Sequence, residues 1–311
     1  MKYLEKNFNE NNLPSLKEVV IWALELFSEK KPEKIEFKNF KKRAIIWSWN
    51  AILAWKILFR NWENFFATEN DYEKILDIKW IDWITILSAS WWKHSSIMAQ
   101  FFKDKWYEIE LITCTENSKT AWIIWDENCI VTSKNPEPYT YNTSTYLWWI
   151  LWSTWENQDE ILEYLTDLEE NLKGFDFTKF HWFLFALPSE LWLASWMIDT
   201  KFIELFWREI SRDIKTFEEL KHACSVVVSK DELLIKFWTE KNLDESEVYF
   251  NWEELEIEIP ENFWYASILF LWYFLTWIIQ EQEPDYFRES IWKYVEYLNN
   301  SDFWKGTKVF W

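Results

Sequence analysis

Residues 83–96 bring hydroxyl groups, a cation and a histidine together in an order that could bind phosphate. The stretch reads WITILSASWWKHSS, in which a short apolar run typical of a buried strand is followed by a turn at Ser88, Ala89 and Ser90. A helix is expected from His94 to Lys105, because apolar residues recur there at helical spacing. Free N–H groups and the helix dipole would face an anion held in this turn, so the stretch predicts a phosphate site.

The same turn also carries Trp91 and Trp92, where glycine is normally needed for close backbone approach. The chain has 28 Trp and only 2 Gly in 311 residues, whereas average usage of about 7% predicts roughly 22 glycines. Trp47 and Trp49 flank Ser48 just after a predicted strand. Our hypothesis is that most tryptophans are glycine in the native protein, because some bacterial lineages read UGA as glycine. The alternative is a Trp-rich protein that stacks sugars or bases on exposed indoles.

Composition excludes several classes of protein. A net charge of −19 argues against nucleic acid or an anionic membrane as the main partner. The most apolar segment, Ala266–Ile279, is too short to span a bilayer, and no signal peptide is expected. Cys114, Cys129 and Cys224 show no paired spacing, so neither a disulfide framework nor a zinc site is predicted. We expect a cytoplasmic protein without a metal or another cofactor.

Alternating strand and helix patterns predict an α/β fold with parallel sheets covered on both faces. The length favours two domains: an N-terminal helical extension at 1–40, a first domain at 41–172 and a second at 173–311 with C-terminal helices. The expected strands are Arg43–Ile46, Asn64–Ala67, Ile84–Ser88, Glu108–Thr113, Cys129–Thr132, His181–Ala186, Ser225–Val228 and Leu233–Phe237. Val248–Ile259 is an acidic stretch with alternating apolar residues. The expected helices are Leu16–Phe27, Ala51–Asn61, Tyr72–Leu76, His94–Lys105, Thr145–Leu172, Glu190–Met197, Thr200–Ile210, Tyr265–Gln280 and Asp285–Leu298.

With glycine restored, residues 43–51 read RAIIGSGNA and the central turn reads SASGGKHSS. Together with KFIELF at 201–206 and EELKH at 218–222, these motifs resemble the sugar isomerase (SIS) domain, whose strand–turn–helix motif binds the phosphate of a phosphosugar. The resemblance covers roughly residues 41–300. It implies two doubly wound parallel-sheet SIS domains, and the chain is most similar to the bifunctional phosphoglucose/phosphomannose isomerases.

Phosphate binding is the first role that the resemblance implies. The residues assigned to it are Ser48, Ser88, Ser90, Trp91 (as a glycine), Lys93 and Ser96. Lys93 takes the place of a hydroxyl residue of the family and could pair with phosphate as a point charge, while Ser95 or Ser96 would supply the hydroxyl. The competing interpretation is that these serines only cap the following helix.

Two residues match the catalytic positions of the family. Glu204 matches the general base that moves a proton between C1 and C2 of the sugar through an enediol, and its apolar neighbours predict a desolvated carboxylate. His222 matches the histidine that opens the sugar ring, in a segment that can reach the neighbouring subunit's site, so a homodimer is implied. The alternatives are an exposed helix glutamate and a structural histidine.

Two departures from the family pattern weaken the case for catalysis. An arginine that follows a proline in the family is absent, because the chain has Pro138–Tyr139 at that place. The C-terminal lysine of the family has only loose counterparts in Lys305 and Lys308. Arg208 and Arg212 are the candidates to compensate for the missing oxyanion partner.

The leading prediction is a phosphosugar isomerase that interconverts glucose 6-phosphate or mannose 6-phosphate with fructose 6-phosphate. A non-catalytic phosphosugar sensor is the first alternative, and related chemistry on amino-sugar phosphates or glycated amines is the second. A Trp-rich lectin-like protein is the last.

Overall fold

A computed structural model describes most of the chain. The described residues are 12–31, 43–47, 51–59, 64–89, 93–116, 118–124, 128–138, 140–223, 227, 229–242, 244 and 253–300. Several sequence predictions lie outside these residues, namely those on Ser48, Ser90, Trp91, Tyr139, Lys305 and Lys308 and on most of the strand Ser225–Val228. For Lys93 only the backbone is described.

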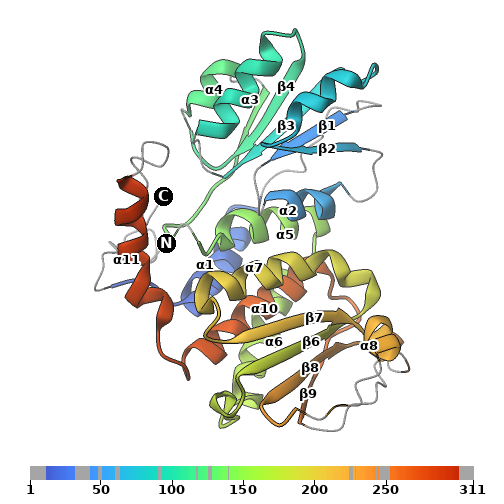
Figure 1. The fold of residues 1–311 in the computed structure, drawn as a ribbon, viewed down its shortest axis with the longest axis vertical. Coiled ribbons are helices and arrows are strands. Elements are labelled where there is room, and N and C mark those ends of the chain that lie inside the picture. The colour runs from blue at the N-terminus through green and yellow to red at the C-terminus, as the bar shows by residue number, and fades with distance from the viewer. Residues whose placement is uncertain are drawn as a thin grey trace.

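The first sheet has five parallel strands in the order β2-β1-β3-β4-β5. One face packs on α3 and α4, and the other packs on α2 and α5 (Figure 1). Coverage on both faces explains why these strands read as continuous apolar runs. The bounds are β1 (Arg43–Trp47), β2 (Asn64–Thr68), β3 (Trp83–Ser88), β4 (Glu108–Thr113), β5 (Cys129–Val131), α2 (Ala51–Leu58), η1 (Tyr72–Asp77, a 3-10 helix), α3 (Lys93–Lys103) and α4 (Lys119–Ile124).

The second sheet has four parallel strands in the order β7-β6-β8-β9. Its inner face packs on α7 and α10, while α8 packs on the other face through Phe217 and Leu220. The bounds are β6 (Trp182–Leu187), η4 (Phe177–Lys179, a 3-10 helix), η5 (Ser189–Ala194, a 3-10 helix), α7 (Ser195–Phe206), β7 (Ser211–Thr216), α8 (Phe217–Ala223), β8 (Glu232–Trp238), η6 (Glu240–Asn242, a 3-10 helix) and β9 (Glu254–Glu258). The two parallel sheets confirm the predicted α/β class with tandem doubly wound units.

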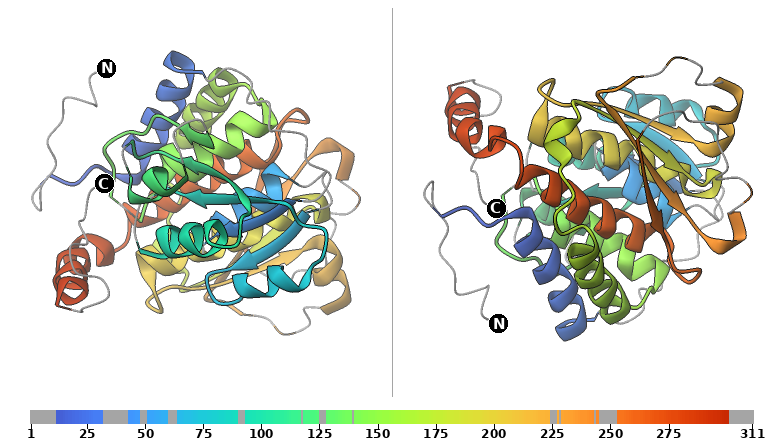
Figure 2. Two further views of the ribbon diagram at one scale, coloured as in Figure 1. Left: turned by 90° about the horizontal axis from the view of Figure 1, so that it is seen from above. Right: turned by 90° about the horizontal axis from the view of Figure 1, so that it is seen from below.

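A layer of helices lies between the two sheets (Figure 1). Its centre is α10 (Tyr265–Gln280), in which every residue except Trp277 is buried, as expected for a helix that is apolar all round. Helix α1 (Leu16–Glu29) packs against α10 and against α6 (Gln158–Asn171). Helix α11 (Tyr286–Asn299) lies at the periphery, away from both sheets (Figure 2). No helix in the described part of the chain is long and apolar enough to cross a membrane.

The predicted long helix Thr145–Leu172 is wrong. The segment consists of a π-helix, η3 (Thr143–Leu147), then α5 (Trp148–Thr154), a break, and α6. At the break, Trp155 adopts a left-handed conformation and the Glu156 carboxylate caps α10, accepting N–H groups from Trp264 at 2.6 Å, Ala266 at 2.8 Å and Ser267 at 3.0 Å. A carboxylate at a helix N-terminus satisfies backbone N–H groups that have no partner within the helix, and it interacts favourably with the helix dipole. The break between α5 and α6 places Glu156 at this position on α10.

Three of the four non-glycine residues with positive φ in the described chain are tryptophans. Trp106 (φ 65°), Trp155 (φ 57°) and Trp207 (φ 51°) all follow a helix, at the position where glycine is favoured. Buried indole N–H groups normally find a hydrogen-bond partner. Five of them have none among the described residues, those of Trp55, Trp148, Trp238, Trp272 and Trp277. Both observations agree with the glycine hypothesis.

We predict that Glu156→Gln lowers the free energy of unfolding by about 1–3 kcal/mol, because a buried charge-assisted cap is lost. The measurement is urea denaturation. The matched control is Glu163→Gln on the exposed side of α6, which should leave stability unchanged. Equal stability of the two variants would contradict the capping role.

Candidate functional site

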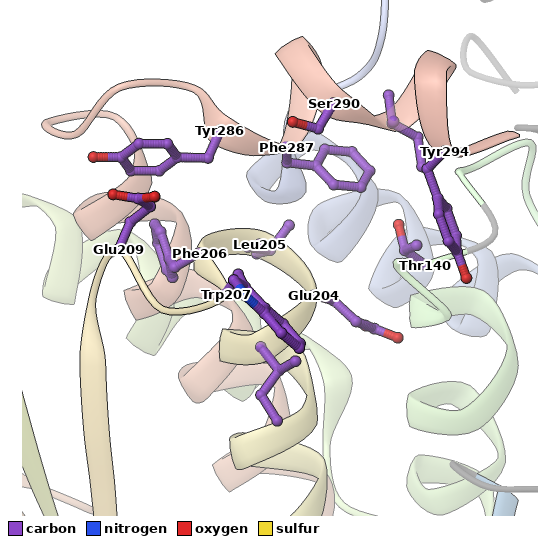
Figure 3. A pocket seen from close by; sticks show the side chains of 12 residues that line it. Thr140, Glu204, Leu205, Phe206, Trp207, Glu209, Tyr286, Phe287, Ser290 and Tyr294 are labelled. Carbon is purple, nitrogen blue, oxygen red and sulfur yellow. The ribbon is translucent and has the colours of Figure 1, made fainter. Parts of the chain in front are cut away.

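A cavity of about 660 Å³ lies between the C-terminal end of α7 and α11. Figure 3 shows the polar ends of Thr140, Glu204 and Tyr294 toward one end of it, and Tyr286 and Phe206 toward the other. Its volume falls in the range of small-molecule sites. The lining residues are Thr140, Ile203, Glu204, Leu205, Phe206, Trp207, Glu209, Tyr286, Phe287, Ser290, Ile291 and Tyr294.

Glu204, the base predicted from the sequence, is held by a buried ammonium group. The Nζ atom of Lys201, one turn earlier on α7, lies 2.6 Å from Oε2 of Glu204 and also donates to the backbone carbonyl of Thr140. The same Nζ lies 4.9 Å from the ring centroid of Tyr273. The Lys201 side chain is 1% exposed and that of Glu204 is 22% exposed. Glu204 therefore faces the cavity with a fixed orientation and is not enclosed by its apolar neighbours.

Sequence reasoning missed Lys201. The available signal was a lysine three residues before a glutamate inside an otherwise apolar helical run, KFIE. That spacing places both side chains on one face of a helix. Lysines are almost never fully buried unless they are paired, so nothing local distinguished this one from a surface residue.

The described part of the predicted phosphate turn lies at the carboxyl edge of the first sheet. Parallel neighbours β1 and β3 bring Trp47 opposite Leu87, so the turns that follow both strands start at the same edge, where ligands of such folds bind. Ser88 ends β3 and is half-buried. Ser95 and Ser96 are buried in the first turn of α3, and the Ser95 hydroxyl is 3.0 Å from that of Thr120 in α4.

Burial raises the pKa of a thiol beside this edge and of a nearby phenol. The Cys114 thiol donates to the carbonyl of Ala89, directly after Ser88, at 3.0 Å. Burial raises the pKa of Cys114 to about 12, so the thiol stays protonated. Burial also raises the pKa of Tyr146, and the charge of the Glu204 carboxylate adds to that rise.

Glu137 has a structural role. It directly precedes Pro138–Tyr139, where the sequence resemblance implies an arginine that this chain lacks. Its carboxylate accepts the backbone N–H groups of Thr143 and Ser144 at 3.0 and 3.1 Å and their hydroxyls at 2.5 and 2.8 Å. Burial raises the pKa of Glu137, and these hydrogen bonds oppose that rise. The carboxylate thereby fixes the connection between β5 and α5.

The predicted substitutes for the arginine do not line the cavity. Arg212 pairs with Asp199 at 2.7 Å, and Arg208 lies beside the Trp207 ring. A cation that sequence reasoning missed is Lys134, whose pKa is lowered by burial and raised in part by Cys114 and Glu137. Lys134 follows β5 and therefore lies near the carboxyl edge of the first sheet.

His222 lies far from Glu204 in the same chain. It is on α8, where its side chain is 80% exposed and its Nε2 atom is 3.1 Å from Oε1 of Glu218. Glu204 precedes β7 and His222 follows it, and a six-residue strand spans roughly 20 Å. Figure 1 shows α8 and α11 at opposite ends of the second unit. One chain alone therefore does not bring the two predicted catalytic residues together.

Comparison of the sequence with family models gives no match, and comparison with curated proteins gives none either. Solved structures share the fold. Tagatose-6-phosphate ketose/aldose isomerase from Escherichia coli matches with a TM-score of 0.59 and 10% identity, over 98% of this chain and 99% of that one. The C-terminal domain of glucosamine-fructose-6-phosphate aminotransferase from Francisella tularensis matches with a TM-score of 0.59 and 12% identity, over 89% of this chain and 100% of that one.

Glucosamine-6-phosphate deaminase from Thermotoga maritima also matches, with a TM-score of 0.55 and 12% identity, over 86% of this chain and 91% of that one. These likenesses define the class: an α/β chain with the tandem sugar isomerase fold. At such identities the likeness shows the fold alone, so the activity must be argued from the site.

We predict that iodoacetamide at pH 8 labels Cys114 far more slowly than Cys129 in the folded protein. Only the thiolate reacts with iodoacetamide. At pH 8 the raised pKa of Cys114, about 12, makes its thiolate fraction about 1,000-fold or more smaller than that of a cysteine with the ordinary pKa near 8.5. Cys129 is only half-buried. Peptide mass mapping reads each cysteine separately, and unfolding in denaturant should equalise the two rates. Rapid labelling of Cys114 in the native protein would contradict its burial.

Proposed function

We propose that this protein is a phosphosugar aldose–ketose isomerase. The observation that carries the proposal is the Glu204 carboxylate, held at 2.6 Å by a buried ammonium in the wall of a cavity of about 660 Å³. A base of this kind, on a fold shared with phosphosugar enzymes, suits proton transfer at a sugar carbon. The particular reaction proposed is interconversion of glucose 6-phosphate or mannose 6-phosphate with fructose 6-phosphate.

In the proposed mechanism, Glu204 takes the proton from C2 of the open-chain aldose, which gives an enediol. It then delivers a proton to C1, while a proton moves from the oxygen on C2 to the oxygen on C1, so that the ketose forms without a redox partner. The Lys201 ammonium holds the Glu204 carboxylate in place in the cavity wall. Partial enclosure of the cavity restricts water near the reacting carbons.

Phosphate binding is proposed for Ser48, Ser88 and Ser90 with Lys93 at the start of α3. Ring opening is proposed for His222, acting in the site of the other subunit of a homodimer. The exposure of His222 and its separation from Glu204 within one chain support this arrangement. We place the enzyme in the cytoplasm.

The proposed phosphate turn requires that positions 91 and 92 be glycine in the native protein. The positive φ angles of Trp106, Trp155 and Trp207 support this, as do the five partnerless indole N–H groups among the described residues. A glycine at position 207 would also widen the cavity, since Trp207 forms part of its wall.

We predict that tryptic peptides of the protein purified from its native source carry the mass of glycine at positions 91, 92, 106, 155 and 207. Peptide mass spectrometry, with the UGA codons read from the gene, makes the measurement. Gly174, the glycine described here, serves as the internal reference. Tryptophan masses at positions 91 and 92 would remove the phosphate turn from this proposal.

The main alternative is a phosphosugar sensor without catalysis. The cavity lining favours this alternative because catalysis would need a cation beside the oxyanion. Among the described residues, the lining contains Glu204 and Glu209 but no lysine, arginine or histidine. An amino-sugar phosphate isomerase or deglycase would use the same carboxylate on a different substrate, and a substrate panel separates these possibilities.

We predict that Glu204→Gln lowers kcat for conversion of fructose 6-phosphate by about 10²–10⁴-fold, because the proton acceptor is lost. Isothermal titration should show that the variant still binds fructose 6-phosphate. Glu163→Gln, on the exposed face of α6, is the control and should retain full turnover. Undiminished turnover by Glu204→Gln would exclude Glu204 as the base.

A further inference from the structure

Thr140 has an unusual hydroxyl group. The residue is 7% exposed and lines the cavity, yet its Oγ1 atom has no hydrogen-bond partner among the described residues. Buried polar side chains are normally satisfied, so each exception needs a reason. The Oγ1 atom is buried in the free protein but belongs to a residue of the cavity wall, so a ligand that enters the cavity is the candidate partner for it.

Neighbouring hydroxyl residues of the same connection are satisfied. The Thr143 hydroxyl lies 3.0 Å from the carbonyl oxygen of Val19 and 2.5 Å from the Glu137 carboxylate, and its single proton is donated to one of them. Ser144 donates to Glu137 at 2.8 Å, and Thr145 lies 3.3 Å from the side-chain oxygen of Asn142. The missing partner at Thr140 is therefore a local feature and does not reflect a loosely packed segment.

Lys201 fixes Thr140 beside Glu204. Its single Nζ atom donates both to the Thr140 carbonyl and to the Glu204 carboxylate, so both acceptors lie within hydrogen-bond reach of one nitrogen. Figure 3 shows the Thr140 and Glu204 side chains toward the same end of the cavity, together with Tyr294. A molecule that places a carbon against Glu204 in this cavity would bring its adjacent substituents to Thr140.

We propose that Thr140 is a specificity-determining residue whose hydroxyl binds a sugar hydroxyl adjacent to the carbons that exchange a proton with Glu204. The inference rests on the proposed function for the identity of the ligand as a sugar phosphate. The free protein carries an unpaired hydroxyl, and the ligand satisfies it. A site built in this way discriminates against molecules that lack the matching hydroxyl, because the protein group is then left unpaired.

The test replaces Thr140 by valine, which keeps the side-chain shape and removes the hydroxyl. Thr140→Val should leave the melting temperature of the ligand-free protein unchanged or higher, because no hydrogen bond of the free protein is lost. Its Kd for fructose 6-phosphate should rise roughly 3- to 10-fold, the value of one neutral hydrogen bond. Its Kd for inorganic phosphate should not change.

Two variants serve as matched controls. Thr143→Val removes a satisfied hydroxyl and should lower the melting temperature without changing sugar binding by the folded protein. Ser195→Ala removes a buried hydroxyl at the other end of α7 that has no partner among the described residues, and should change neither quantity.

Each outcome decides the inference. If Thr140→Val binds fructose 6-phosphate as tightly as the wild type, or loses as much thermal stability as Thr143→Val, the inference is overturned while the isomerase proposal stands. If the wild type binds the sugar without turnover and Thr140→Val weakens binding selectively, the inference stands and the isomerase proposal falls. If the wild type binds no fructose 6-phosphate, both are overturned.

Discussion

The site depends on the burial of one positive charge. An ammonium group removed from water costs several kcal/mol unless it is paired and hydrogen-bonded, and the Lys201 side chain is 1% exposed. Its compensation comes from three parts of the chain: Glu204 on its own helix, the carbonyl of Thr140 from the connection after the first sheet, and the ring of Tyr273 on the central helix. The two units and the central helix layer are therefore tied together at the cavity.

A second buried charge fixes the connection that supplies Thr140. Glu137 accepts four hydrogen bonds from the start of the π-helix, and π-helical turns occur frequently at functional sites. Further along this connection, the Thr140 carbonyl accepts from Lys201, which also donates to Glu204. The Glu137 carboxylate thus has a structural role in this connection.

Much of the fold could be predicted from the sequence because local patterns carried the information. Alternating strand and helix signals gave the parallel sheets, and the uniformly apolar run at Tyr265–Gln280 gave the central helix with its observed bounds. The edge strand β7 (SRDIKT) was missed because Ile214 is its single large apolar residue. The break before α6 was missed because the groups that Glu156 caps lie more than a hundred residues away.

The candidate site was predictable in part. Glu204 followed from a motif, but the roles of Lys201 and Thr140 depend on a contact between residues 61 positions apart, which no local pattern encodes. Likewise, the sequence matched His222 to a catalytic position. The structure shows that β7 separates it from Glu204 within one chain, since Glu204 precedes this strand and His222 lies on α8 after it.

Deuterium exchange tests the central claim most directly. The protein, prepared with the residues that native peptide masses establish, is incubated with fructose 6-phosphate in D₂O, and the sugar is followed by proton NMR. Proton transfer through an enediol by a carboxylate open to solvent predicts loss of a C1 proton signal from the ketose and appearance of aldose 6-phosphate deuterated at C2. Tight binding of fructose 6-phosphate with no exchange and no aldose would contradict the isomerase account and leave a phosphosugar sensor on the same fold.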